Sequence, residues 1–230
     1  MEEYFGTISV QGKGSIHVVP DITRLEVLVE SVLIDYDAAY KQAKDNAQWM
    51  GKILEYNHLD KKLAKTIQFD ISDHLVDNYD ENDHYIGQIK DGFELHQRFK
   101  VDLGMDNVLV NKIVRGVGKF IKGAQINIGY TIQDPRPHQL KMIERAVKDA
   151  HEKADIMAKA ANCKLGAVKD ISYGQQHVTI YSQARNIHSN KEAMACDVNS
   201  LDITPDDLVM SDNVDVSWQL LPNDDTDTKE

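Results

Sequence analysis

The residues with the types and spacing to bind a ligand begin with two glycine pairs, because closely spaced backbone amides can cradle a phosphate. Gly12-Lys13-Gly14 lies in an alternating apolar and polar run, which predicts a strand, and neither a third glycine at the dinucleotide-binding spacing nor a helix follows it. Gly116-Val117-Gly118-Lys119 lies inside a predicted helix, with Phe120 where a phosphate-binding loop has Ser or Thr. Glycine in a strand usually marks a bulge or a close approach of backbone, so both pairs are interpreted as structural and no cofactor is predicted.

Two other stretches carry residue types that ligate metals. His151-Glu152-x-x-Asp155 places His151 and Asp155 on one face of a predicted helix, similar to the two histidines of a zinc-binding HExxH helix, but the sequence indicates no third ligand. The acidic loop 77–84 is rich in oxygen ligands, but counted from Asp80 its fifth residue is His84, where a calcium-binding EF-hand loop has Asp or Asn. A charged helix face and a solvent-exposed hairpin tip explain these stretches, and no metal site is predicted.

The two cysteines and the histidines give no catalytic constellation. Cys163 lies among apolar neighbours after a predicted helix, which favours a small buried side chain, whereas Cys196 lies in a polar connection and is the better redox candidate. No GxSxG, SxxK or CxxC motif occurs, so no catalytic residue is predicted and the chain is expected not to be an enzyme. The rival hypothesis is an enzyme or small-ligand-binding protein that uses a cleft beside residues 175–213, with His17 or His96 in it.

Composition excludes several classes of protein. The 230 residues are 42% hydrophobic and 27% charged, with a net charge of −11 and a pI of about 5.2, which is an acidic globular composition. Such a charge repels phosphate backbones and anionic surfaces, so no nucleic-acid partner is predicted. No segment approaches the roughly 18 consecutive apolar residues of a membrane span. The first residues show neither a basic nor an apolar leader region, which predicts a cytoplasmic protein, although an exported chain trimmed of its leader would look the same.

The elements that must position these residues follow from hydrophobic periodicity. Alternating runs predict strands and apolar spacings of three and four predict helices, in the order strand 7–18, strand 25–29, helix 36–54, strand 66–72, strand 93–103, helix 109–120 and strand 126–132. The first two strands, separated by Val19-Pro20-Asp21, are predicted to form a hairpin, and the third and fourth a long one. The order from Asp21 to Ile132 is that of the ferredoxin-like split βαβ fold, in which two helices cover one face of an antiparallel sheet.

The remaining chain adds a long helix and two strands to this α+β fold. The helix opens at Pro135 and Pro137 and carries small apolar residues up to Ala161. Strands are predicted at 168–173 and 214–220, joined by a polar connection at about 175–213 that exceeds the usual loop length. The tail 222–230 is predicted to be disordered.

Several of these features together resemble the SIMPL-domain family. The opening Val10-Gln11-Gly12-Lys13-Gly14 followed by Pro20-Asp21 is similar to the family's V-x-G-x-G and P-D pattern. The long helix adds Ala146, Asp149-Ala150 and Lys153-Ala154. The resemblance covers residues 6–221 as one SIMPL domain, divided into the core 21–132 and the later elements 133–221.

The resemblance implies an α+β fold, frequent homo-oligomerisation in bacterial envelope members, a link to oxidative stress and, in animals, a link to kinase signalling. It implies no agreed catalytic residues, so the motif residues Gly12, Gly14, Pro20 and Asp21 are expected to be structural. The hypothesis is therefore a non-enzymatic protein that works as a homo-oligomer or by docking a protein partner, because strand edges must be paired or protected.

Overall fold

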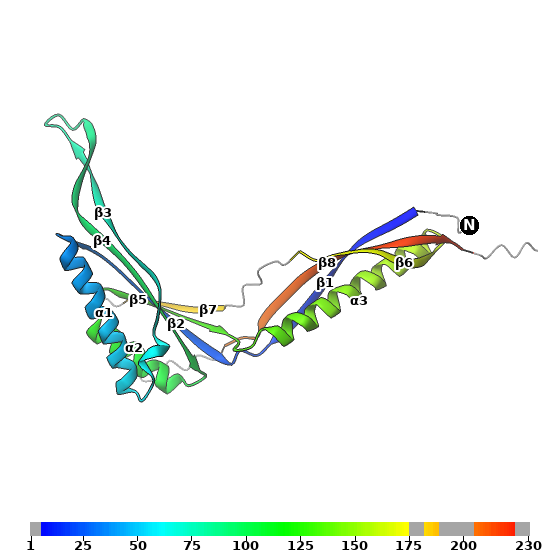
Figure 1. Cartoon of the computed structure of the whole chain (residues 1–230), viewed down its shortest axis with the longest axis horizontal. Coiled ribbons are helices and arrows are strands. Elements are labelled where there is room, and N and C mark those ends of the chain that lie inside the picture. The colour runs from blue at the N-terminus through cyan, green and yellow to red at the C-terminus, as the bar shows by residue number, and fades with distance from the viewer. Residues whose placement is uncertain (1–5, 175–181, 189–204, 224–230) are drawn as a thin grey trace, which may run out of the picture. The chain divides into compact units, whose positions relative to one another are not determined.

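The chain folds into two units with separate hydrophobic cores (Figure 1). The computed structural model describes residues 6–174, 182–188 and 205–223, and for 182–188 it describes the backbone alone. The central unit comprises residues 20–131 and 181–205, and the terminal unit comprises the rest. Both units combine helices with antiparallel sheet, so the fold is α+β as predicted.

The central unit is a five-stranded sheet with the order β3-β4-β2-β5-β7, in which every neighbouring pair is antiparallel. Its strands are β2 (Ile22–Leu33), β3 (Lys65–Tyr79), β4 (Tyr85–Gly104), β5 (Ala124–Thr131) and β7 (Ser182–His188). The helices α1 (Tyr36–Tyr56) and α2 (Asn107–Phe120) pack on one face of this sheet, and a short 3-10 helix, η1 (Lys61–Leu63), leads into β3. The aspartates Asp35 and Asp106 cap α1 and α2 by accepting backbone N–H groups of the first turn.

The terminal unit is a three-stranded antiparallel sheet with the order β1-β8-β6, packed against one long helix. Its elements are β1 (Gly6–Val18), α3 (Arg136–Ala160), β6 (Cys163–Ser172) and β8 (Leu208–Pro222). Alternate residues of β1 and β8 are buried, while α3 presents a row of fully buried alanines to them. Small side chains at this contact let the helix axis lie close to the sheet.

The predicted hairpin between the first two strands is wrong. β1 pairs with β8 along its whole length, from Gly6 opposite Leu220 to Val18 opposite Leu208. β2 pairs instead with β4 and β5 in the other sheet. The alternating pattern reports which face of a strand is buried and carries no information about a partner far along the chain. The predicted long hairpin is confirmed as β3 and β4.

The region predicted as a polar connection contains strand structure. β7 adds to the edge of β5, and β8 begins at Leu208, so three strands follow α3 where two were predicted. The alternation of apolar and polar residues does not reveal the start of β8, because Asp212 occupies one of its inward positions and is 3% exposed. Cys196 and most of the predicted tail lie outside the described residues.

Candidate functional site

The motif glycines of β1 lie against the backbone of α3. A Cβ atom on Gly12 would lie 1.9 Å from the carbonyl oxygen of Ala146, and one on Gly14 would lie 1.9 Å from that of Met142. Any side chain at these positions would displace the helix. The geometry therefore gives both glycines a role in packing α3 onto β1. Of the other two motif residues, Pro20 is buried ahead of β2, and the backbone N–H of Asp21 donates to the carbonyl of Thr131 (3.2 Å).

A row of charged side chains on α3 covers the outer backbone edge of β1. Asp149 accepts the backbone N–H of Lys13 at 2.7 Å, between the two glycines. Arg145 donates to the carbonyl of Ser15 (2.7 Å), and Lys153 donates to that of Gln11 (3.3 Å). The hydrogen bond from Lys153, followed by that from the Lys13 backbone, lowers the pKa of Asp149 below its ordinary value. These contacts satisfy a strand edge that would otherwise offer free backbone groups.

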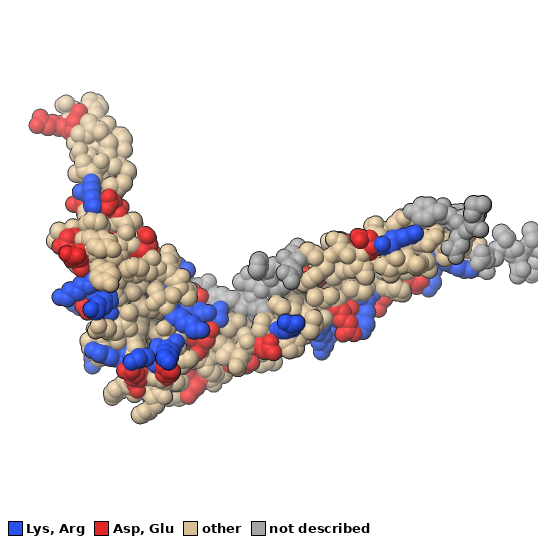
Figure 2. All heavy atoms as spheres, viewed as in Figure 1, with Lys and Arg blue, Asp and Glu red and all other residues tan. Residues whose placement is uncertain are grey.

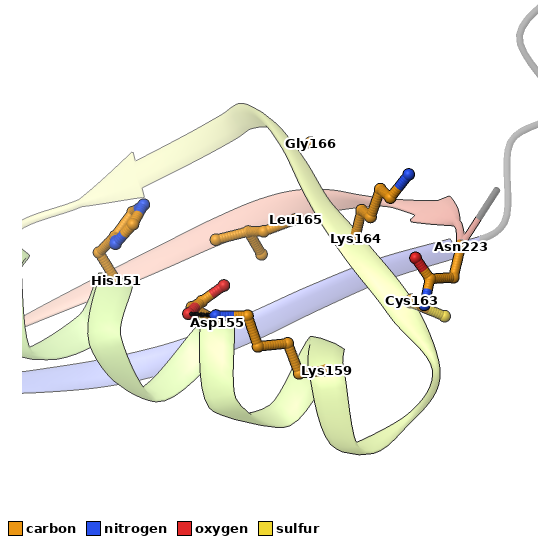
Figure 3. A pocket seen from close by; sticks show the side chains of 8 residues that line it. All are labelled: His151, Asp155, Lys159, Cys163, Lys164, Leu165, Gly166 and Asn223. Carbon is orange, nitrogen blue, oxygen red and sulfur yellow. Dashed lines mark hydrogen bonds and ion pairs between the residues drawn. The ribbon is translucent and has the colours of Figure 1, made fainter. Parts of the chain in front are cut away.

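A pocket of about 550 Å³ lies in the terminal unit where α3 ends and β6 begins (Figure 3). Its lining residues are His151, Asp155, Lys159, Cys163, Lys164, Leu165, Gly166 and Asn223. The three helical residues among them are spaced by four and point to the same side of α3. Lys159 is paired with Asp155 at 2.6 Å, and the ring of His151 packs edge-on against Trp218. The pocket thus offers both charges, an imidazole and a thiol to a small polar molecule.

The sequence pattern placed His151 and Asp155 on one helix face, and the structure shows both lining this pocket. Across the described residues, no group of three or more His, Cys, Asp or Glu side chains is arranged to hold a metal ion. Cys163 was expected to be buried, but it is partly exposed, with its thiol donating to the carbonyl of Ala161 (3.5 Å). It is the first residue of β6, opposite Pro222 at the end of the sheet, and it lines the pocket.

The two histidines of the rival hypothesis have different surroundings. His17 is exposed on β1. His96 lies on the face of the central sheet opposite the helices, where its ring nitrogens approach Glu30 (3.3 Å) and Glu94 (3.2 Å). Cross-strand pairing therefore accounts for His96. Most of the connection that would form the predicted cleft lies outside the described residues.

The hairpin of β3 and β4 continues past the rest of the central sheet as a two-stranded arm, defined here as residues 74–92 (Figure 1). The last pair between β2 and β4 is Leu33 opposite Phe93, so beyond it no described strand flanks β4 on that side. β3 is the outermost strand of its sheet, and among the described residues no strand pairs with its outer edge. In the described part of the chain, the arm is therefore a ribbon of two strands only.

Large apolar side chains cover the arm. Five of them are 50–60% exposed: Leu75, Tyr79, Tyr85, Ile86 and Ile89. The rings of the two tyrosines meet edge to face, with centroids 5.9 Å apart. Exposed apolar groups gathered on one element typically mark a surface that binds another molecule.

The tip of the arm is a tight, acidic turn. Asp80 accepts the backbone N–H groups of His84 (2.9 Å) and Asn82 (2.8 Å), which lower its pKa in that order. Asp83 takes a left-handed backbone conformation, with φ of 60°. The sequence predicted this turn but not the arm, because nothing in the alternation of β3 and β4 says how far their neighbours extend. The available signal was apolar residues on both faces near the turn, at Ile86 and Ile89 and at Tyr79 and Tyr85.

No helix in the described parts of the chain is both long and apolar enough to cross a lipid bilayer.

Comparison with known proteins places the chain in a family. The family described as "Protein of unknown function (DUF541)", named SIMPL, matches residues 8–218. The chain is similar to the "Uncharacterized protein YggE" of Escherichia coli K12, of Escherichia coli O157:H7 and of Shigella flexneri. Each of these relatives is 26% identical over 219 residues, which cover 94% of this chain and 84% of the relative. Because the match spans both units and includes Gly12, Gly14 and the helix that packs on them, the chain belongs to the SIMPL family.

Proposed function

We propose that this protein acts without catalysis, by self-association, and that the arm is the element that binds a second copy. The observation that carries the proposal is the set of five large apolar side chains, at least half exposed, on a two-stranded ribbon. Two-stranded ribbons are marginally stable alone in water, so contact with another molecule both stabilises the arm and removes its apolar surface from water. The homo-oligomerisation implied by the resemblance of the motifs to SIMPL proteins also supports it.

The test shortens the arm at a position where the hairpin can close again. Leu75 lies opposite Lys90, so residues 76–89 can be replaced by Asn-Gly, a dipeptide that favours a two-residue hairpin turn. We expect the full chain to associate in sedimentation at about 100 μM and the shortened variant to remain monomeric. As a control, Ile156→Ser removes an equally exposed apolar side chain from α3 and should leave association unchanged. A full chain that stays monomeric, or a shortened variant that associates equally well, would contradict the proposal.

We also propose that residues 21–132 form a ferredoxin-like split βαβ core. The strand order β3-β4-β2-β5 and the two helices on one face support this arrangement. Nuclear Overhauser contacts provide the test: amide protons of β2 should show cross-strand contacts to both β4 and β5. Contacts between β2 and β3 instead would contradict the arrangement.

A second candidate function is the binding of a small polar molecule in the pocket at the end of α3. Its volume of about 550 Å³ lies in the range of ligand sites, and its lining offers both charges. The link to oxidative stress implied by the resemblance fits here, because Cys163 lines the same pocket. Thermal-shift screening with metal ions, inorganic anions and polar metabolites should reveal a stabilising ligand whose effect disappears in Lys159→Ala. A flat response throughout would count against this candidate.

A further inference from the structure

Helix α2 carries a row of basic side chains on its solvent face. Lys112, Arg115, Lys119 and Lys122 are all exposed. The first three lie on α2, where spacings of three and four residues place them on one side of the helix axis, and Lys122 lies in the turn that follows the helix. Residues 107–122 contain no acidic side chain. In a protein with a net charge of −11, this concentration of positive charge is a local exception. We call these four residues the basic row.

The three lysines of the basic row, Lys112, Lys119 and Lys122, have no acidic partner among the described residues. The contact of Lys119 is with the ring of Phe120, at 5.2 Å from its centroid. Some lysines elsewhere have carboxylate partners, such as Lys153 with Asp149 and Lys90 with Asp73. The lysine ammonium groups of the basic row can therefore form ion pairs with an anionic partner.

The arm has the complementary charge. Its 19 residues (74–92) contain five carboxylates against one lysine: Asp77, Asp80, Glu81, Asp83 and Asp91, with Lys90. Figure 2 shows acidic groups at the far end of the arm, whereas the helical part of the central unit carries both basic and acidic groups. Both ends of α2 also expose an apolar side chain, Val108 (65%) and Phe120 (40%), which suits the apolar side chains of the arm.

The two surfaces match in length. From Lys112 to Lys119 the helix rises about 10 Å, at about 1.5 Å per residue. From Asp77 to Asp80 the arm extends about 10 Å, at about 3.3 Å per residue. The carboxylates near the tip of the arm therefore span a length similar to that of the basic row.

We propose that the arm of one copy binds the basic row on α2 of a second copy. This inference rests on the proposed function and adds the surface that receives the arm. Arm and row are different patches of the same molecule, so the contact is head-to-tail: each copy gives an arm and receives one. Head-to-tail contacts produce a closed ring when the rotation between copies closes, and a filament when it does not.

The test reverses the charge of each surface separately and then combines the variants. The row variant is Lys112→Glu/Lys119→Glu/Lys122→Glu, and the arm variant is Asp77→Lys/Glu81→Lys/Asp91→Lys, which leaves the turn-forming Asp80 in place. We expect each variant alone to associate at least about 10-fold more weakly than the natural chain, because like charges then face each other. An equimolar mixture of the two should associate again, since every contact in it has opposite charges. Circular dichroism and thermal unfolding of each variant show whether it is folded.

Lys41→Glu/Lys44→Glu/Lys62→Glu is the matched control, since it makes the same charge change on exposed lysines of α1 and η1. It should associate as the natural chain does. If the row variant associates normally while the shortened arm does not, the arm binds elsewhere and this inference is wrong, although the proposed function stands. If the natural chain is monomeric, both fail. Binding of the row to a DNA oligonucleotide or heparin, with association unaffected by the row variant, would assign the row to a polyanion and overturn the inference.

Discussion

The backbone N–H of Lys13 donates to Asp149 at 2.7 Å, which links the two parts of the sequence that most resemble the family pattern. Because residues 12 and 14 are glycines, no side chain on either side of that N–H keeps α3 away from β1. The helix therefore lies close enough for the carboxylate of Asp149 to reach the strand backbone. The spacing of Gly12 and Gly14 and the position of Asp149 on α3 are thus parts of one packing arrangement.

Replacement of Asp149 by Asn should remove part of the sensitivity of the fold to acid. The pKa of Asp149 is lowered in the folded chain, so its carboxylate stabilises the fold above its ordinary pKa of 3.8, and this contribution is lost as the pH falls through the lower folded value. The free energies of unfolding of the natural chain and of Asp149→Asn, measured in urea, should therefore differ near neutral pH and differ less at a pH well below 3.8. Asp155→Asn, which alters a carboxylate on the same helix that contacts Lys159 and not β1, serves as the control. An equal difference at both pH values would contradict this role of Asp149.

Gly12→Ala should destabilise the terminal unit strongly. The added Cβ meets the carbonyl oxygen of Ala146 at 1.9 Å, and a helix backbone cannot move aside as a side chain does. We expect the free energy of unfolding to fall by about 3 kcal/mol. Gly118→Ala is the control: nothing lies within 4 Å of its Cβ position in α2, so alanine should raise stability by about 0.5–1 kcal/mol. Chemical denaturation measures both, and equal effects would show that the space around Gly12 is not what requires glycine.

Local pattern was sufficient to predict most elements but not their partners. The three helices and all strands except β7 follow from residue spacing, because burial of one face leaves a period in the sequence. The pairing of β1 with β8 depends on residues far apart in the chain, and nothing in either strand encodes it. Family resemblance grouped Gly12 with Asp149, yet only the structure shows that they meet at the same strand edge.

The candidate sites were harder to predict than the fold. The arm follows from the difference in length between β2 and the β3–β4 hairpin, a property of the sheet and not of any segment. The pocket combines the end of α3 with β6 and Asn223, which are brought together by the turn after Ala160. The basic row is visible in the sequence, but only the structure shows that its side chains are exposed and that its lysines have no acidic partner among the described residues.

A buried amide pair in the central unit should be sensitive to the loss of one partner. Asn46, which is 5% exposed, donates to the side-chain oxygen of Gln97 (3.2 Å), and Gln97, which is 3% exposed, donates to the carbonyl of Ala43 (3.0 Å). Asn46→Leu leaves the Gln97 oxygen buried without this donor and should cost about 1–3 kcal/mol. Combining it with Gln97→Leu should cost less free energy than the sum of the single changes. Each single change leaves one buried amide without its partner, whereas the double variant leaves none. A double-mutant cycle by urea unfolding measures the coupling, and strict additivity would contradict it.

Tyr173→Phe should weaken the fold by releasing a buried carboxylate from its donor. The hydroxyl of Tyr173 donates to Asp212 at 2.6 Å, and Asp212 fills an inward position of β8 that a neutral side chain would ordinarily occupy. The hydrogen bond to Asp212, with some burial, raises the pKa of Tyr173 above 10.0, so its contribution is complete below that value and lost as the pH rises through the higher folded pKa. We expect a loss of about 1 kcal/mol at neutral pH that shrinks in strong alkali. Burial also raises the pKa of Tyr130, so ultraviolet difference titration should show one fewer late-ionising tyrosine in Tyr173→Phe than in the natural chain. Identical titration curves, apart from the loss of one ordinary tyrosine, would show that Asp212 is not held by this hydroxyl.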